Sequence, residues 1–167
     1  NDGKLIARRG GTRLAYFTKA LDPESELAMQ GNRYPVTQIG IKSLIGRLYE
    51  VGREDVQYGE CDVQYLEDVA VNGRNCTVIQ VTHPVRRTNF QYHMARIFLD
   101  NELQVPIRFA AYDWPSGGDD RPVLLEEYTY IDLKLNLGLT DWDFDTRNEE
   151  YGFGREVDQE RLAIDSQ

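Results

Sequence analysis

The 167-residue sequence predicts an α+β domain in which one helix packs on an antiparallel sheet. Two observations predict hairpins: the dipeptide Asn72-Gly73, typical of a tight turn, and the run Gln91–Trp114, which can fold back on itself. A third observation predicts the helix, because apolar residues recur at helical spacing between Thr37 and Gly52. With 41% hydrophobic and 28% charged residues, the composition is ordinary for a globular protein able to bury a core.

Charge and hydropathy argue against nucleic-acid binding and against a membrane span. The net charge of -9 argues against nucleic acid, because phosphate binding draws on clustered Lys and Arg. No apolar run approaches the roughly 18 residues of a membrane span. The chain begins at Asn1 without a signal-peptide pattern, so we expect a processed product or a fragment.

The N-terminal part is expected to contain a hairpin and a loop. Lys4–Arg9 and Thr12–Ala20 can pair around Gly10-Gly11. The loop Met29–Pro35 then carries Gly, Arg and Tyr just before a helix, which suits either an anion site or an ordered lid. The lid is the favoured interpretation.

The helix is predicted from its cap, its apolar stripe and its end. Thr37 offers an N-cap hydroxyl, and Gly52 stands where a helix would stop. The apolar positions between them are Ile41, Leu44, Ile45, Leu48 and Val51. They form one stripe, which is wide enough to lie on one face of a sheet.

About five up-and-down strands are expected after the helix: Gln57–Leu66, Cys76–His83, Gln91–Leu99, Gln104–Tyr112 and Pro122–Leu135. Around Asn72-Gly73, the residue numbers of cross-strand partners sum to 145, so Cys76 faces Val69 and Cys61 faces Pro84. The two thiols would then lie far beyond the Cα separation of about 7 Å that a disulfide allows. Nor do the two cysteines and two histidines follow a zinc-binding spacing.

The central hairpin is the most informative segment. With Asn101-Glu102 at its tip, partner numbers sum to 203. One face then carries Tyr92, Met94, Arg96, Phe98, Val105, Ile107, Phe109 and Ala111, and the other carries His93, Ala95, Ile97, Leu99, Pro106, Arg108, Ala110 and Tyr112. Both faces are predominantly apolar, whereas a sheet with one wet face alternates cleanly. The helix can cover one face, and the other would meet more sheet or a cavity that holds an apolar guest.

Such a cavity supplies the candidate ligand-binding residues Tyr92, Met94, Arg96, Phe98, Ile107 and Phe109. Two cations lie among apolar neighbours in this hairpin, Arg96 and Arg108. Each can pair with a carboxylate of the next strand, for which Glu126, Glu127 and Asp132 are the candidates. The alternative is a cation at the cavity mouth that holds an anionic head group.

No catalytic or metal site is predicted. The run Asp141–Asp145 has aspartates at alternate positions, but Thr146 and Gly152 stand where a calcium loop needs Gly and Glu. We interpret it as a closing strand with its aromatic residues inward and its carboxylates in water. In the predicted registers, His83 and His93 have no carboxylate or nucleophile beside them. We therefore expect neither enzymatic activity nor a cofactor.

Several segments carry a family resemblance. In their order and spacing, these segments resemble an uncharacterised family of exported bacterial proteins. They are GNRYPVTQIGIKSL, YGECDV, VNGRNCTVIQVTHPV, NFQYHMARIFLDNELQVPIRFAAYDWP and EEYTYIDLKLNLGLTDWDFD. The similarity runs from about Asn1 to about Phe153. More distantly, the strand order and the closing L-x-D-x-D-F phrase resemble the lipoprotein-localisation-factor-like superfamily, whose periplasmic members carry lipoprotein acyl chains or related lipids.

The resemblance implies a strongly curved antiparallel sheet, a half-barrel, with a helix on its concave side and an apolar cavity between them. It implies one domain over residues 1–153, followed by a charged tail at 154–167, and a location in the periplasm or cell envelope. Family members place a helix and several strands before the point where this chain starts. Their absence implies an incomplete N-terminus and an open edge near Lys4–Ala20, where a protein partner could bind.

The leading functional hypothesis is a non-catalytic cell-envelope protein that shelters a lipid or acyl chain in its curved sheet. The alternative is a structural or interaction module whose sheet edge or concave face is completed by another chain. A hydrolase-like enzyme is the third and least favoured hypothesis.

Overall fold

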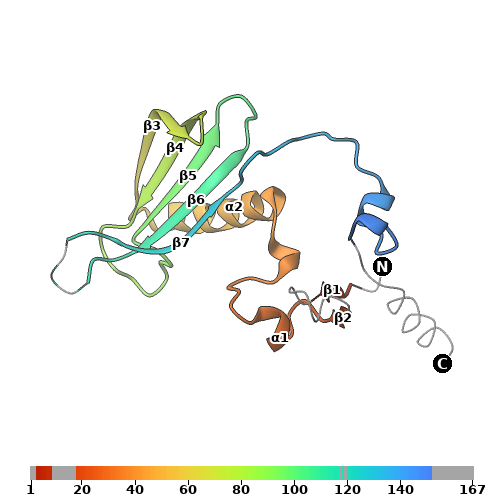
Figure 1. Cartoon of the computed structure of the whole chain (residues 1–167). Coiled ribbons are helices and arrows are strands. Elements are labelled where there is room, and N and C mark those ends of the chain that lie inside the picture. The colour runs from red at the N-terminus through yellow and green to blue at the C-terminus, as the bar shows by residue number, and fades with distance from the viewer. Residues whose placement is uncertain (1–2, 9–17, 117, 119, 152–167) are drawn as a thin grey trace. The chain divides into compact units, whose positions relative to one another are not determined.

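The computed structural model describes residues 3–8, 18–116, 118 and 120–151 (Figure 1). The chain divides into two compact units. The first unit comprises Asn1–Ile39 with Lys134–Gln167, and the second comprises Gly40–Leu133.

The first unit contains the strands β1 (Leu5–Arg8) and β2 (Thr18–Leu21), the helix α1 (Glu26–Met29) and the 3-10 helices η1 (Val36–Gln38), η2 (Asp141–Phe144) and η3 (Glu149–Tyr151). β1 and β2 pair antiparallel as a two-stranded sheet of their own, which confirms the pairing predicted for the N-terminal strands. The predicted turn at Gly10-Gly11 and the predicted tail at 154–167 lie outside the described residues. In the predicted loop, Arg33 lies over the ring of Tyr34 at 5.7 Å.

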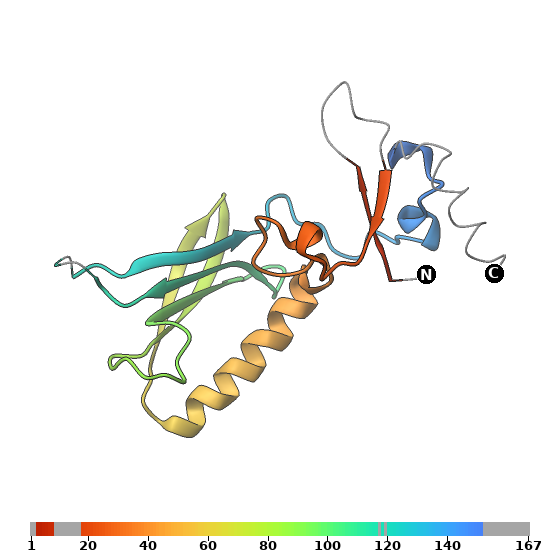
Figure 2. The same ribbon diagram turned by 90° about the horizontal axis from the view of Figure 1, so that it is seen from below.

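The second unit contains the helix α2 (Ile41–Tyr58) and the strands β3 (Asp62–Val71), β4 (Arg74–Thr82), β5 (Met94–Asp100), β6 (Pro106–Asp113) and β7 (Val123–Thr129). The strands form one antiparallel sheet in chain order, and α2 lies along one of its faces (Figure 2). The predicted α+β class is confirmed. The predicted half-barrel is wrong, because the sheet is neither closed nor strongly curled.

α2 is longer and begins later than predicted. It starts after Gly40 and ends at Gly59, whose φ of 62° places it in the left-handed conformation typical of a helix end. The predicted N-cap, Thr37, lies in η1 instead, and the predicted stop, Gly52, lies within the helix. Gln57, the predicted start of the first long strand, therefore lies in the helix.

The β3–β4 hairpin has the predicted turn. Asn72 and Gly73 have φ values of 49° and 80°, as the two-residue hairpin turn requires. Next to the turn, Val69 faces Cys76, as predicted from a sum of 145. A bulge between Leu66 and Val69 then shifts the register by one residue. The thiols of Cys61 and Cys76 are both free.

The predicted register of the central hairpin is wrong. Met94 faces Tyr112 and Ile97 faces Phe109, so the partner numbers sum to 206 instead of 203. The turn is longer than expected because the Asp100 carboxylate holds it open. Asp100 Oδ1 accepts hydrogen bonds from the backbone N–H groups of Glu102 at 2.9 Å and Leu103 at 2.8 Å.

A register shift by an odd number changes which side chains share a face. On the face that α2 covers, cross-strand partners form two rows: Tyr65, Ile79, Ile97, Phe109 and Tyr128, and beside them Val63, Val81, Ala95, Ala111 and Glu126. The opposite face carries the rows Gln64, Gln80, Arg96, Ala110 and Glu127, and Leu66, Val78, Phe98, Arg108 and Thr129. Over the whole sheet, one face is therefore apolar and the other is mixed. Within the central hairpin both faces carry apolar residues, as predicted, but Met94 and Phe98 share their face with Ala110 and Tyr112 and not with the predicted partners.

The core of the second unit consists of two clusters. Beneath α2, Tyr92, Phe109 and Ala111 are buried and pack against Leu44 and Leu48 of the helix. On the mixed face, the second cluster consists of Val71, Cys76 and Ile107, with Phe98, Val105 and Leu133 packed against it.

The C-terminal part of the predicted sheet is also different. β7 ends at Thr129 rather than Leu135, and the positive φ of Asp132, 52°, breaks the extended conformation soon afterwards. The predicted closing strand forms η2 instead, because Thr140 and Asp143 cap that short helix reciprocally. Phe144 is 72% exposed, so its predicted inward orientation is wrong.

Candidate functional site

The apolar face of the sheet is wider than the helix that covers it. In the row that runs from Tyr65 to Tyr128, Phe109 is 5% exposed beneath α2, whereas Tyr65 is 68% exposed. Ile79, which lies between β3 and the covered centre, is half-buried. The neighbouring row repeats the pattern, since Ala111 is fully buried and Val63 is exposed.

We call the uncovered part of this face the open apolar strip and define it by Val63 and Tyr65 of β3 and Ile79 and Val81 of β4. Sequence reasoning missed the strip, although the alternation of Val63 and Tyr65 with the polar Asp62 and Gln64 was a usable signal. The signal is short, because Leu66 interrupts the alternation after two apolar residues.

The six predicted ligand-binding residues do not gather on one surface. Tyr92 and Phe109 lie in the cluster beneath α2, with their rings edge to face at 6.2 Å. Ile107 is buried in the other cluster, against which Phe98 packs. Met94, Arg96 and Phe98 share the mixed face with Tyr112 of β6.

The two arginines of the mixed face are held by neighbouring side chains. Arg108 pairs with Glu127 of the next strand, which confirms the predicted ion pair for this residue. Its guanidinium also lies over the ring of Phe98 at 5.3 Å. Arg96 donates to Gln80 Oε1 at 2.8 Å and lies over the ring of Tyr112 at 5.9 Å. These contacts are typical of a polar sheet surface.

A buried histidine and aspartate connect α2 to the sheet. His83 is 3% exposed and stacks on Phe90 with ring centroids 4.0 Å apart. Its Nδ1 lies 2.9 Å from the carbonyl oxygen of Tyr92, and its Nε2 lies 3.2 Å from Asp55 Oδ2, at ion-pair distance although not aligned for a hydrogen bond. The prediction that His83 has no carboxylate beside it is wrong, because the helix runs on to Asp55.

The ring nitrogens of His83 both face groups of the protein itself. A carbonyl oxygen only accepts, so the Nδ1 of His83 carries a proton, and the Nε2 faces the Asp55 carboxylate. Both ring nitrogens are thus directed at acceptors of the protein itself, and neither reaches solvent. A general acid or base needs a nitrogen within hydrogen-bond reach of its substrate.

Replacing His83 by glutamine should raise the pKa of the Asp55 carboxyl further. Burial raises the pKa of Asp55 above its ordinary value of 3.8, and the adjacent His83 ring lowers it. Removing the ring leaves burial and the nearby Glu54 carboxylate, both of which raise the pKa. A carbon-detected NMR titration of Asp55 measures the change, with His93→Gln as the matched variant. A lower or unchanged Asp55 pKa in His83→Gln would contradict this arrangement.

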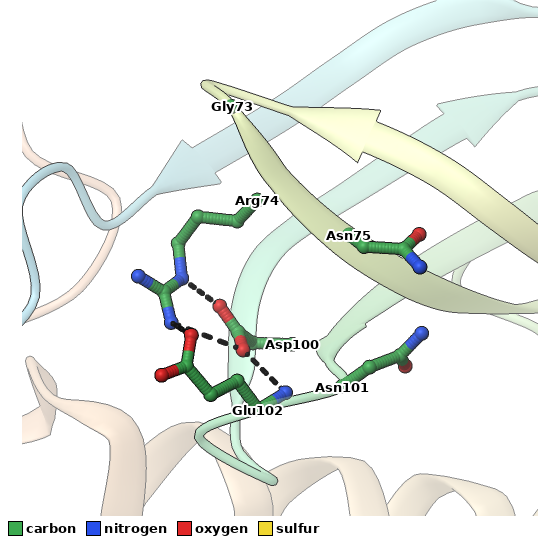
Figure 3. A pocket seen from close by; sticks show the side chains of 6 residues that line it. All are labelled: Gly73, Arg74, Asn75, Asp100, Asn101 and Glu102. Atoms are coloured by element: carbon green, nitrogen blue, oxygen red, sulfur yellow. Dashed lines mark hydrogen bonds and ion pairs between the residues drawn. The ribbon is translucent and has the colours of Figure 1, made fainter.

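A polar pocket of about 360 Å³ lies at the tips of the β3–β4 and β5–β6 hairpins (Figure 3). Its lining consists of Gly73, Arg74, Asn75, Asp100, Asn101 and Glu102. Arg74 pairs with Asp100 and, at 3.1 Å, with Glu102. The hydrogen bond from Arg74 lowers the pKa of Asp100 to about 2. These charged side chains pair with one another. Arg74, Asp100 and Glu102 thus form a clamp that joins the two hairpin turns.

Asp143 of η2 and Asp145 directly after it are held by neighbouring residues. Asp143 accepts from the backbone N–H and the hydroxyl of Thr140, which lowers the pKa of its carboxyl, and Asp145 pairs with Arg147. Within residues 3–8, 18–116, 118 and 120–151, no three His, Cys, Asp or Glu side chains gather in a way that could hold a metal ion. Among the described helices, none combines the length and apolar character needed to cross a membrane.

Comparison with known proteins identifies one family. The sequence profile of a family described as a protein of unknown function, DUF1571, matches residues 1–153. No curated protein and no solved structure shows a significant match to the chain. The predicted membership of an uncharacterised family is confirmed, whereas bacterial origin, export and similarity to lipoprotein carriers stay predictions. The chain belongs to the DUF1571 family.

Proposed function

We propose that this protein is a non-catalytic binding protein that takes an apolar ligand, a lipid or acyl chain, on the open apolar strip. One observation carries the proposal: a single cross-strand row is buried at Phe109 and solvent-exposed at Tyr65. Apolar surface that a protein leaves uncovered beside its own core is typical of a ligand or interaction site.

The strip suits an alkyl chain better than a polar metabolite. Its four side chains, Val63, Tyr65, Ile79 and Val81, offer aliphatic and aromatic contacts, and the phenol of Tyr65 is the polar group among them. Binding sites for apolar ligands have this composition, with few polar groups that fix orientation. A location in the periplasm or cell envelope is part of the proposal and rests on the family resemblance.

A fluorescent C16 fatty acid tests the proposal. Binding to the full chain should saturate, and Tyr65→Glu should weaken it by at least about tenfold, because the ligand then loses aromatic contact and meets a charge. Phe144→Glu is the matched control, since it changes an equally exposed aromatic of the first unit by the same charge. Equal affinity of Tyr65→Glu and the native chain would refute the strip as the site.

The second candidate function is an interaction module. It is favoured by a separate observation, the exposure of every residue from Asp62 to Asp68 in the edge strand β3. Native mass spectrometry of protein purified without added lipid separates the two candidates. Co-purifying acyl species support the ligand-binding function, and a bound polypeptide supports the interaction module.

A further inference from the structure

We infer that the outer edge of β3 accepts an extended basic strand of a partner protein by β-augmentation. β3 is an edge strand of the five-stranded sheet, so one side of its backbone pairs with β4 and the other has no strand partner among the described residues. This inference adds a protein partner to the proposed apolar ligand. It shares Val63 and Tyr65 with the open apolar strip and adds Asp62, Glu67 and the outer backbone edge of β3.

The first half of β3 is a suitable template for another strand. Asp62–Leu66 pairs with β4 without interruption, and the bulge comes only after Leu66. Edge strands are commonly protected by Pro, Lys or an early bulge, but the sequence DVQYLEDVAV contains neither Pro nor Lys. The other edge strand, β7, is less regular, because its pairing with β6 is interrupted between Ala111 and Tyr112.

The side chains of β3 determine the chemistry of the partner. Asp62 begins this segment and Glu67 directly follows it. Both are exposed, and the exposed Val63 and Tyr65 lie between them. Opposite charges on facing strands stabilise a pair, and like charges destabilise it. An antiparallel partner therefore needs a basic residue facing Asp62 and another facing Glu67, with apolar residues facing Val63 and Tyr65.

The same charges disfavour a second copy of this chain as the occupant. If two β3 strands paired antiparallel around Gln64, the centre of the regular segment, Asp62 of each copy would face Leu66 of the other. Each Asp62 carboxylate would then face an apolar residue and gain no basic partner. With a net charge of -9, the chain as a whole also repels itself at neutral pH.

A pair of labelled peptides tests the inference by fluorescence polarisation with the full chain. The core Lys-Thr-Val-Thr-Ile-Lys should bind about tenfold more tightly than Glu-Thr-Val-Thr-Ile-Glu, because each end then forms or loses a cross-strand charge pair. In the double variant Asp62→Lys/Glu67→Lys the preference should reverse. Glu149→Lys/Glu150→Lys adds the same charge to exposed residues of the first unit and should leave the preference unchanged.

Backbone N-methylation distinguishes strand pairing from simple charge attraction. In an antiparallel pair, alternate amides of the peptide point toward and away from the template strand. Methylating one alternate set should therefore weaken binding by about tenfold, and methylating the other set should not. Equal effects of the two sets, or an unchanged preference in Asp62→Lys/Glu67→Lys, would overturn the inference.

Two further results would also overturn it. One is a loss of preference in Glu149→Lys/Glu150→Lys as large as in the β3 variant. The other is a dimer at neutral pH in sedimentation that Asp62→Lys abolishes, since the edge would then hold a second copy. The fatty acid probe is measured on the same variants. If it binds while neither peptide does, the basic-strand inference fails and the proposed function stands.

Discussion

Replacing Phe109 by alanine should lower the free energy of unfolding by about 3–5 kcal/mol, the usual effect of removing a buried aromatic ring. Phe109 contacts Tyr92 edge to face and lies in the cluster that Leu44 and Leu48 of α2 cover. Its removal would leave a cavity where helix and sheet meet. Urea unfolding followed by far-UV circular dichroism measures the loss.

Tyr65→Ala is the matched control, because Tyr65 lies in the same cross-strand row but is exposed. Substitutions at exposed positions usually change stability by no more than about 0.5 kcal/mol. A similar loss in both variants would mean that Tyr65 is as well packed as Phe109. The open apolar strip would then not exist, and the proposed ligand site would fail with it.

Replacing Asp100 by alanine should lower the free energy of unfolding by about 2–4 kcal/mol, because a buried charge pair and two backbone caps are lost together. The Asp100 residue is 1% exposed, pairs with Arg74 and accepts from the amides of Glu102 and Leu103. Glu102→Ala removes the other carboxylate on Arg74. The side chain of Glu102 is 85% exposed, so its loss should change stability by less than about 1 kcal/mol. Equal losses of stability in Asp100→Ala and Glu102→Ala would contradict the central role of Asp100 in the clamp.

The clamp also predicts the acid sensitivity of the hairpin tips. Asp100 has a folded pKa of about 2, below the ordinary value of 3.8. A lowered pKa means that the stabilisation is present above the ordinary value and is lost as the pH falls through the folded value. The stability of the native chain should thus fall between about pH 4 and 2, and more steeply than that of Asp100→Asn. Parallel acid-unfolding curves for the two proteins would contradict this assignment.

The parts of the fold that local chemistry determines could be predicted from the sequence. Asn72-Gly73 specifies a two-residue turn almost alone, so both the turn and the adjacent pairing of Val69 with Cys76 are as predicted. The ion pair of Arg108 with Glu127 followed from the expectation that a cation between apolar neighbours finds a carboxylate on the next strand.

The remaining errors arose where tertiary contacts select between local alternatives. Gly52 and Gly59 can each end a helix, and the structure uses Gly59, which allows Asp55 to reach His83. Asn101-Glu102 is an acceptable tip, but hydrogen bonds to Asp100 select a longer loop. Neither choice can be read from spacing, because it depends on residues that are distant in the chain or on side-chain geometry within the turn.

The predicted set of ligand-binding residues depended on the length of the loop after Asp100. Once the partner of Ile97 is Phe109, Arg108 moves to the side of Phe98, and the six predicted ligand residues separate. It was thus easier to predict which residues are buried than to predict which residues lie beside one another on the sheet. Only the observed pairing places Tyr65 and Phe109 in one row.

The length of the loop after Asp100 determines which side chains of β5 and β6 share a face of the sheet. Adding or deleting one residue there would turn β6 over relative to β5, so that Phe109 would point to water and Arg108 toward α2. Loop length is therefore under tighter constraint at this tip than loop composition, provided that Asp100 is kept. Homologues with an altered loop are expected to change its length by two residues at a time.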